Sequence, residues 1–438
     1  MKAFESELVD QHFEEYLKAL ARLLAVESVE GPPEAGAPFG PGPRKALDVM
    51  LEIASSWGFE VENVDNAVGF ACWNAPGQET AVDDYVGVLG HLDVVAAGTG
   101  WHYPPFALTI DGNQAFGRGV LDNKGPTLAS LFAAKLLKDS GRVYGKNLRL
   151  IFGTNEESGS ADLAYYLAKH PAPRLGFTPD SQFPAVYAEK GVLAVRLSTL
   201  FKSAALAGLK AIEGDFVASS IPDQATFVLS DGTRYSFTGK RTPSNEPQLG
   251  LNALTLGASQ LCHEKRLSSQ LQAYFAWLRD CLHEQHAGEG LLGSTAAMAL
   301  QISPHTLELS DDQLHLSLSI RYSIDFEEAQ IYKLLQDNLP TAQTQLTITR
   351  SFPPIAFDRS HPMLETMRRT YEAVTGLDGR PIITTGATYA RFMPNIIAFG
   401  PSFPGQIGIA HNHNEYMFVD DLKRNIEIYR LTLDELLR

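Results

Sequence analysis

Apolar residues near the N-terminus recur with helical spacing. Those at residues 5–26 fall on one helical face, and a second pattern of this kind runs through 44–57. Gly58 follows the second pattern, where a helix C-cap belongs. The run at 85–89 is apolar on both faces, as in a buried central strand. The pattern predicts two amphipathic helices followed by strands of a sheet.

Strands and helices then alternate along the chain. An apolar helix is predicted at 127–138, a strand ends at Glu156, and a short helix follows near 160–169. Alternation of this kind is typical of an α/β domain. We therefore predict a mixed, largely parallel sheet flanked by helices.

From about Val192 the texture changes to shorter alternating strands around helices, including one long helix predicted at 252–282. From His361 the earlier α/β pattern returns. The first domain is therefore predicted to be discontinuous, at 1–188 and 357–438, and residues 189–356 to form an inserted α+β domain.

Composition narrows the function classes. The formal charge of the 438-residue chain is -15, which argues against nucleic-acid binding. No apolar run is long enough to span a membrane, and the N-terminus has no signal-like apolar region. Three widely spaced cysteines, Cys72, Cys262 and Cys281, are interpreted as free thiols in a reducing compartment. We expect a cytoplasmic protein without nucleic-acid or membrane partners.

Two adjacent carboxylates, Glu156 and Glu157, end an apolar run and open a Ser/Gly turn. Neighbouring side chains of a strand point to opposite faces, so one carboxylate could bind a metal while the other transfers protons. The alternative is a solvated acidic turn.

Five acid or histidine positions fall in loops that follow predicted strands, where chemistry concentrates. Imidazole and carboxylate ligands without thiolate suit catalytic Zn²⁺, Mn²⁺ or Co²⁺. Asp93 lies two residues after His91 and could orient its ring, although His91 taken alone is better interpreted as an ordinary core or surface histidine. The five positions are His91, Asp122, Glu157, Asp180 and His411.

Four blocks resemble, in order and spacing, those of the M20 family of di-metal peptidases, and the PepV-type (Xaa-His, carnosinase-like) dipeptidases in particular. The blocks are GHLDVV (90–95), GRGVLDNKGP (117–126), GTNEESG (153–159) and TPDSQFP (178–184). The branch is suggested by APFG (37–40), AEKG (188–191), TYAR (388–391) and the 411–417 run.

The resemblance implies a ligand set for two divalent metal ions. His91 and Asp180 would hold one ion, Glu157 and His411 the other, and Asp122 would bridge them. Zn²⁺ fits this set best, with Mn²⁺ or Co²⁺ as alternatives.

The resemblance also implies which residues assist the attack of water on the scissile peptide bond. Glu156 would be the general base and later the acid, and Asp93 would orient His91. The Asp122–Asn123 peptide bond would be cis.

Substrate recognition is implied less directly. Arg321 of the insert matches an arginine that grips the substrate carboxylate in relatives, with an exposed strand arginine as the alternative. Gly386, Thr388 and Arg391 are weaker candidates for the same end of the substrate. Ala387 replaces a usual glycine at this turn, which makes backbone contacts there uncertain if the turn needs a positive φ.

The insert departs from the family at one position. Relatives carry a histidine that hydrogen-bonds the oxyanion, and Pro243 stands at its place in the stretch 239–253. Proline cannot donate a hydrogen bond. Lys240, Arg241 or Asn245 could supply a substitute donor, the substrate could differ, or turnover could be slow.

Two other histidine patterns are interpreted as structural. The HEQH run at 283–286 has its histidines three residues apart, unlike H-E-x-x-H, and suits a solvated helix end. His413 could pair with His411, but only His411 aligns with the family ligand. The remaining histidines are given structural roles: His12, His102, His170, His263, His305, His315 and His361.

Together these features predict a metal-dependent dipeptidase whose inserted domain is a lid over a catalytic domain. The substrate would be a small peptide with a free N-terminus and a small or β-amino-acyl first residue. An N-acyl amino-acid deacylase and a catalytically weak metal-dependent ligand-binding protein are the alternatives. The insert resembles in size the large lid of PepV-type dipeptidases, which imitates a partner subunit, and this resemblance favours a monomer over a homodimer.

Overall fold

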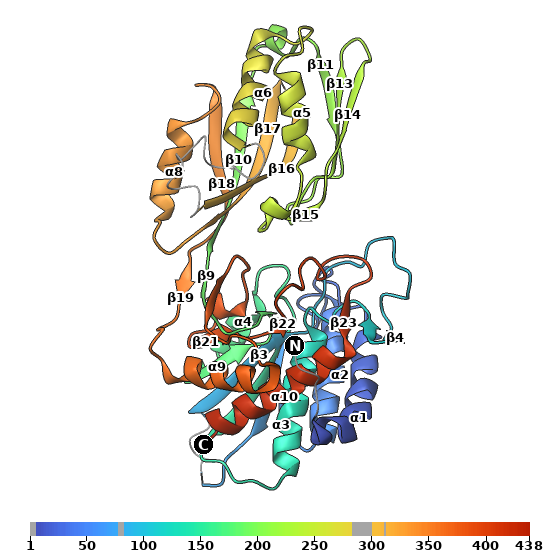
Figure 1. Ribbon diagram of the computed structural model, residues 1–438, viewed down its shortest axis with the longest axis vertical. Helices are drawn as coiled ribbons and strands as arrows, with labels where there is room; N and C mark the ends of the chain where they lie inside the picture. Colours follow the sequence, from blue (N-terminus) through green and yellow to red (C-terminus); the bar gives the residue numbers. More distant parts are fainter. Residues whose placement is uncertain (1–5, 78–82, 283–299, 311) are drawn as a thin grey trace. The chain divides into compact units, whose positions relative to one another are not determined.

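The chain forms two compact units in the computed structural model, which describes residues 6–77, 83–282, 300–310 and 312–438 (Figure 1). Unit 1 comprises Met1–Ala188 and Phe357–Arg438, and unit 2 comprises Glu189–Ala356. None of the helices in the described ranges combines the length and apolarity needed to cross a membrane.

Unit 1 is built on a mixed sheet. Its four central strands are parallel, and the next strand on either side of them pairs antiparallel. In order across the sheet they are β1 (Glu60–Val64), β2 (Val68–Trp73), β6 (Asn147–Gly153), β3 (Tyr85–His91), β7 (Leu175–Thr178), β21 (Ile396–Ala398), β9 (Val186–Glu189) and β19 (Ile355–Ala356), and β20 (Ile382–Thr384) pairs with β9. The predicted mixed sheet is confirmed, with its parallel part at the centre.

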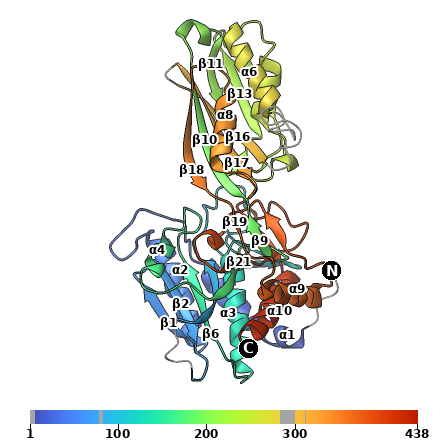
Figure 2. The same cartoon turned by 90° about the vertical axis from the view of Figure 1, so that its left-hand side faces the viewer.

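Helices cover both faces of this sheet because its central strands, β3 and β6, are buried along their whole length. Figure 2 shows α3, α9 and α10 on one side and α4 on the other. The helices of unit 1 are α1 (Glu7–Leu24), α2 (Pro41–Ser56), α3 (Lys124–Asp139), α4 (Asp162–Leu167), α9 (Pro362–Thr375) and α10 (Val419–Leu436). Gly58, with a φ of 78°, follows α2 as predicted.

Three small pairings in unit 1 shape the loops above the sheet. β4 and β5 form a hairpin, and β23 adds a third strand to it. The elements are β4 (Thr109–Asp111), β5 (Gln114–Phe116), β23 (Tyr416–Phe418), the parallel pair β8 (Ser181–Gln182) and β22 (Pro401–Ser402), and the 3₁₀ helix η4 (Tyr389–Arg391).

Unit 2 has the α+β composition predicted for the insert. Its main sheet is antiparallel and shares one apolar core with three helices. The sheet order is β16 (Leu300–Ser310), β17 (Gln313–Tyr322), β10 (Gly191–Leu200) and β18 (Thr344–Phe352), and the helices are α5 (Ala253–Leu261), α6 (Ser269–Leu282) and α8 (Glu328–Asp337). Smaller pieces are the sheet β11 (Leu209–Glu213), β13 (Gln224–Leu229) and β14 (Arg234–Thr238), the pair β12 (Ser220–Ile221) and β15 (Thr242–Pro243), and the 3₁₀ helices η1 (Ser203–Leu206) and η2 (Pro247–Leu249).

The single long helix predicted at 252–282 is wrong. α5 ends at Leu261, and α6 begins at Ser269 after a turn. Ser268 explains the new start, because its Oγ accepts a hydrogen bond from the backbone N–H of Leu271 at 3.2 Å, as an N-cap does.

Two sequence interpretations can be followed only in part. Cys72 and Cys262 are free thiols, as interpreted, whereas the side chain of Cys281 lies outside the described residues. The 283–286 run also lies outside them.

His305 couples the stability of unit 2 to pH. The strand register shifts between Pro304 and Thr306, and the His305 side chain is 7% exposed. Burial lowers the pKa of its imidazole to about 4. Between pH 6.5 and 4 the unfolded chain binds a proton that the folded chain does not, so stability falls as the pH falls through this window. His305→Gln should reduce this acid destabilisation by up to about 3 kcal/mol in urea unfolding at pH 4.5 and 7.

The exposed histidine of the same unit, His263, provides the control. His263→Gln should keep the wild-type acid destabilisation. An unchanged pH dependence in His305→Gln would show that the imidazole titrates normally in the folded protein.

Candidate active site

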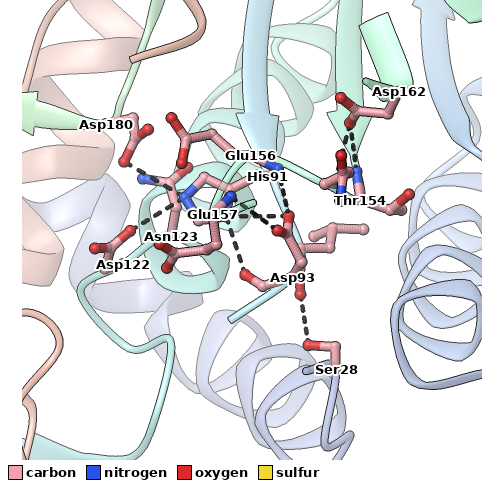
Figure 3. A network of polar contacts seen from close by, with 12 residues as sticks. Ser28, His91, Asp93, Asp122, Asn123, Thr154, Glu156, Glu157, Asp162 and Asp180 are labelled. Atoms are coloured by element: carbon pink, nitrogen blue, oxygen red, sulfur yellow. Dashed lines mark hydrogen bonds and ion pairs between the residues drawn. The ribbon is translucent and has the colours of Figure 1, made fainter. Parts of the chain in front are cut away.

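The parallel strands of unit 1 deliver the candidate residues to one edge of the sheet. His91 ends β3, Glu156 and Glu157 follow β6, and Asp180 follows β7. Loops that follow the carboxyl ends of parallel strands are where open α/β sheets bind ligands. Figure 3 shows these side chains converging with Asp122, from the loop before α3.

Asp122 lies between two imidazoles. Its Oδ1 is 3.1 Å from Nε2 of His91, and its Oδ2 is 3.0 Å from Nε2 of His411. His91 Nε2 is also 3.5 Å from Asp180 Oδ1, and His411 Nε2 is 3.1 Å from Glu157 Oε2. One carboxylate thus connects a His–Asp pair with a His–Glu pair, and the predicted ligand positions lie together.

The ligand atoms lie close enough to share metal ions. Atoms of His91, Asp122 and Glu157 lie within 4.8 Å of one another, as do atoms of His91, Glu156 and Asp180. Glu157 Oε1 is buried and has no hydrogen-bond partner among the residues that the structure describes. A buried oxygen of this kind is costly unless something binds it, and a cation would do so.

Negative charge exceeds positive charge in this cluster. Burial lowers the pKa of His91, but Asp180, Asp122 and Asp93 outweigh burial and raise that pKa well above its ordinary value. Burial and the nearby Asp180 carboxylate raise the pKa of Glu156 well above its usual range. Two imidazoles meet five carboxylates, so divalent cations fit the charge as well as the donor chemistry of the cluster. The carboxylates are those of Asp93, Asp122, Glu156, Glu157 and Asp180.

Asp93 differs in detail from the sequence expectation. Its carboxylate accepts the backbone N–H of Glu156 at 3.1 Å and of Glu157 at 3.0 Å. Nδ1 of His91 is 3.0 Å from the backbone oxygen of Asp93 and 3.4 Å from its carboxylate. A proton on Nδ1 would leave Nε2 as the ligand atom. Asp93 therefore holds the Glu156–Glu157 turn with its side chain and His91 mainly with its backbone.

The Asp122–Asn123 peptide bond is cis, which confirms the predicted mark of the site. His411 has a φ of 62°, a left-handed conformation that is uncommon for residues other than glycine.

Asp162 is a site residue that the sequence did not reveal. Its Oδ2 accepts the backbone N–H groups of Thr154 at 2.7 Å and Asn155 at 3.2 Å, and the Tyr389 hydroxyl at 2.5 Å. Burial raises the pKa of Asp162 to about 6. In the sequence Asp162 resembled an ordinary acid in the first turn of a helix, and only the folded chain shows that it holds the segment leading to Glu156.

The weaker substrate candidates lie around η4. Thr388 is buried and caps η4 by accepting the N–H of Ala390 at 3.1 Å, and Gly386 N–H donates to Thr384 at 3.2 Å. Ala387 has no positive φ, so the alanine causes no backbone strain there. Arg391 lies at the end of η4 and is half-buried.

Two further candidates lie apart from this cluster. Arg321 belongs to unit 2, where it lies on β17 between Val192 of β10 and Gln301 of β16, and its role stays a prediction. The His413 ring lies close to Gly100: if Gly100 carried a Cβ, that atom would be 3.6 Å from the nearest atom of the His413 ring. In the described part of the chain, the close groups of possible ligand atoms include neither His413 nor His411, but His411 lies 3.0 Å from Asp122 and 3.1 Å from Glu157.

The comparisons with known proteins agree with this geometry. The model of peptidase family M20/M25/M40 matches residues 87–435. The chain belongs to peptidase family M20. Among M20 relatives, "Putative dipeptidase YtjP" of Bacillus subtilis is 29% identical over 446 residues, which cover 94% of this chain and 93% of that protein. A relative with a similar description from Staphylococcus haemolyticus is 28% identical over 463 residues, which cover 97% of each.

Solved structures show the same M20 fold. Human carnosine dipeptidase 1 matches with a TM-score of 0.64 and 15% identity, over 99% of each chain. Aminoacylhistidine dipeptidase from Vibrio alginolyticus matches with a TM-score of 0.59 and 14% identity, also over 99% of each chain. The resemblance to M20 peptidases predicted from the four blocks is confirmed, and the protein is a peptidase.

Proposed function

We propose that this M20 peptidase hydrolyses dipeptides that carry a free N-terminus, with Glu156 as general base. The observation that carries the proposal is the Asp122 carboxylate, which presents one oxygen to each of two imidazoles. A carboxylate in that position is suited to bridge two metal ions.

In this proposal the cluster holds two divalent ions, with Zn²⁺ fitting the donors best. His91 and Asp180 would hold one ion, Glu157 and His411 would hold the other, and Asp122 would contribute to both. When bound, the ions would acidify the attacking water and polarise the scissile carbonyl.

Glu156 and Glu157 would have different roles in the reaction because their side chains face different partners. Glu157 Oε2 lies 3.1 Å from His411, whereas a Glu156 oxygen groups with atoms of His91 and Asp180. Asp93 fixes the backbone of both residues. Glu156 would take the proton of the attacking water and pass it to the leaving amine.

Unit 1 is then the catalytic domain and unit 2 the lid. Arg321 would bind the substrate carboxylate through its planar guanidinium, and Gly386, Thr388 and Arg391 would support the same end of the substrate. This assignment rests on the family resemblance and not on a contact between the units.

A second candidate function follows from Pro243: a catalytically weak, metal-dependent ligand-binding protein. Pro243 lies in β15 opposite Ser220, where relatives carry the histidine donor. Arg241, one possible substitute, donates to Asp223 at 3.0 Å and to the Asp215 carboxylate at 3.1 Å. Arg241 is thus engaged by two acids within unit 2, and Lys240 and Asn245 are the other candidates for the substitute donor.

A substrate panel tests the proposal. Metal-loaded protein should hydrolyse free dipeptides faster than their N-acetylated forms by roughly tenfold or more in kcat/KM, since the free amine would be recognised. The release of free amino acids, followed by chromatography, measures both rates. Preference for the N-acylated forms would identify a deacylase, and binding of dipeptides without turnover of any amide would identify the weak member.

A further inference from the structure

A buried carboxylate from the C-terminal part of the chain holds the backbone next to Asp122. Glu415 is fully buried. Its Oε1 accepts the backbone N–H groups of Gly119 at 3.1 Å, Leu121 at 2.9 Å and Asp122 at 3.1 Å. One oxygen therefore fixes the loop that carries Asp122.

The other oxygen of Glu415 binds a buried cation. Arg118 Nη1 donates to Oε2 at 2.6 Å, and both side chains are almost completely buried. The Arg118 guanidinium also lies 5.2 Å from the ring centroid of Trp101 and donates to the Ala96 carbonyl at 3.4 Å. This partner and the three N–H groups offset much of the cost of burying a carboxylate at this depth.

Glu415 also anchors the segment that carries His411. It lies four residues after His411, and its carbonyl accepts the N–H of Gly117 at 3.1 Å. The strand that follows, β23, pairs with β5 from Tyr416 onward. The same residue thus ties the His411 segment to the loop before α3.

The two segments meet at the candidate ligands. Asp122 Oδ2 and His411 Nε2 are 3.0 Å apart, although the two residues lie 289 positions apart in the chain. His411 is 44% exposed and has a φ of 62°, so burial of its own side chain does little to hold it. Glu415 links the backbones of the two segments that carry these ligand atoms.

We propose that Glu415 is a positioning residue that sets the spacing of Asp122 and His411, and through it the metal affinity of the cluster. The inference rests on the metal roles given under the proposed function. A glutamine would keep one acceptor oxygen but would turn an NH₂ group toward Arg118, placing two donors face to face.

Metal titration of Glu415→Gln tests the inference. Calorimetry with Zn²⁺ alone, and visible absorption with Co²⁺ alone, should show that at least one of the two ions binds roughly 10- to 100-fold more weakly than in the wild type, as found for partners that orient ligands. The Co²⁺ spectrum should change in shape, because the ligand geometry changes. Glu415→Asp, which keeps the charge but withdraws the carboxylate, should weaken binding in the same direction and serves if the glutamine variant does not fold.

Asp434→Asn is the matched control. Asp434 is a buried carboxylate of unit 1 that accepts hydrogen bonds from Arg142 at 2.5 Å and Tyr144 at 2.6 Å. Its loss should lower the melting temperature of the metal-free protein and leave metal affinity unchanged.

Each outcome bears on a different claim. Wild-type affinity and a wild-type Co²⁺ spectrum in the Glu415 variants would overturn the positioning role, whatever their melting temperature. Equal weakening in Asp434→Asn would assign the effect to lost stability and would overturn it too. A wild-type protein that binds no divalent ion would overturn the proposed metal scheme itself.

Discussion

Replacing Glu156 by glutamine should lower kcat for dipeptide hydrolysis by about 10³-fold and leave the metal content unchanged. The Glu156 side chain lies beside Asp180 and His91, and its backbone is held by Asp93, so the amide should occupy the same place. An amide cannot accept the proton of the attacking water. Steady-state kinetics on a free dipeptide, together with metal analysis of the dialysed protein, measures both effects.

Glu157→Gln provides the contrast. Glu157 Oε2 faces His411, and its Oε1 is buried without a hydrogen-bond partner, so this residue should affect metal binding first. The variant should lose at least one ion on dialysis. If Glu156→Gln lost metal and Glu157→Gln kept it, the roles of the two residues would be exchanged.

Several elements of the fold were predictable because their signals are local. β3 and β6 are mostly apolar and are buried along their whole length, as expected for central parallel strands. α9 begins with Pro362 and ends before Gly376, whose φ is 71°, so the sequence itself carries a signal for each end of this helix. The break between α5 and α6 was missed because apolar spacing continues through it and only Ser268 marks the new start.

The sequence blocks that carry the candidate ligands were predictable for the same reason, because their signals are local. Each candidate ligand lies in a short block after a strand, so the blocks could be identified one at a time. The residues that hold these blocks together could not be identified in this way. Asp162 binds Tyr389, and Glu415 binds Arg118, across more than two hundred residues of chain. A single sequence carries no sign of such pairs, since each partner is an ordinary acid or base until the chain folds.

The second large effect on kcat is expected at Pro243, the position of the lid that departs from the family pattern. Pro243→His should raise kcat for dipeptides by about 10²-fold, because one oxyanion donor is typically worth that much. The local backbone should tolerate the change. Ser244 N–H donates to the Ser219 carbonyl at 2.8 Å and Glu246 N–H to the Pro243 carbonyl at 3.0 Å, and neither bond uses the proline nitrogen.

Pro243→Ala separates the donor from the loss of the ring. The alanine variant frees the backbone in the same way but adds no side-chain donor, so its kcat should stay near the wild-type value. Equal gains in both variants would attribute the effect to backbone freedom. No gain in either would mean that the oxyanion is already stabilised elsewhere, and Lys240→Met and Asn245→Ala would then show whether the 239–253 segment supplies the donor.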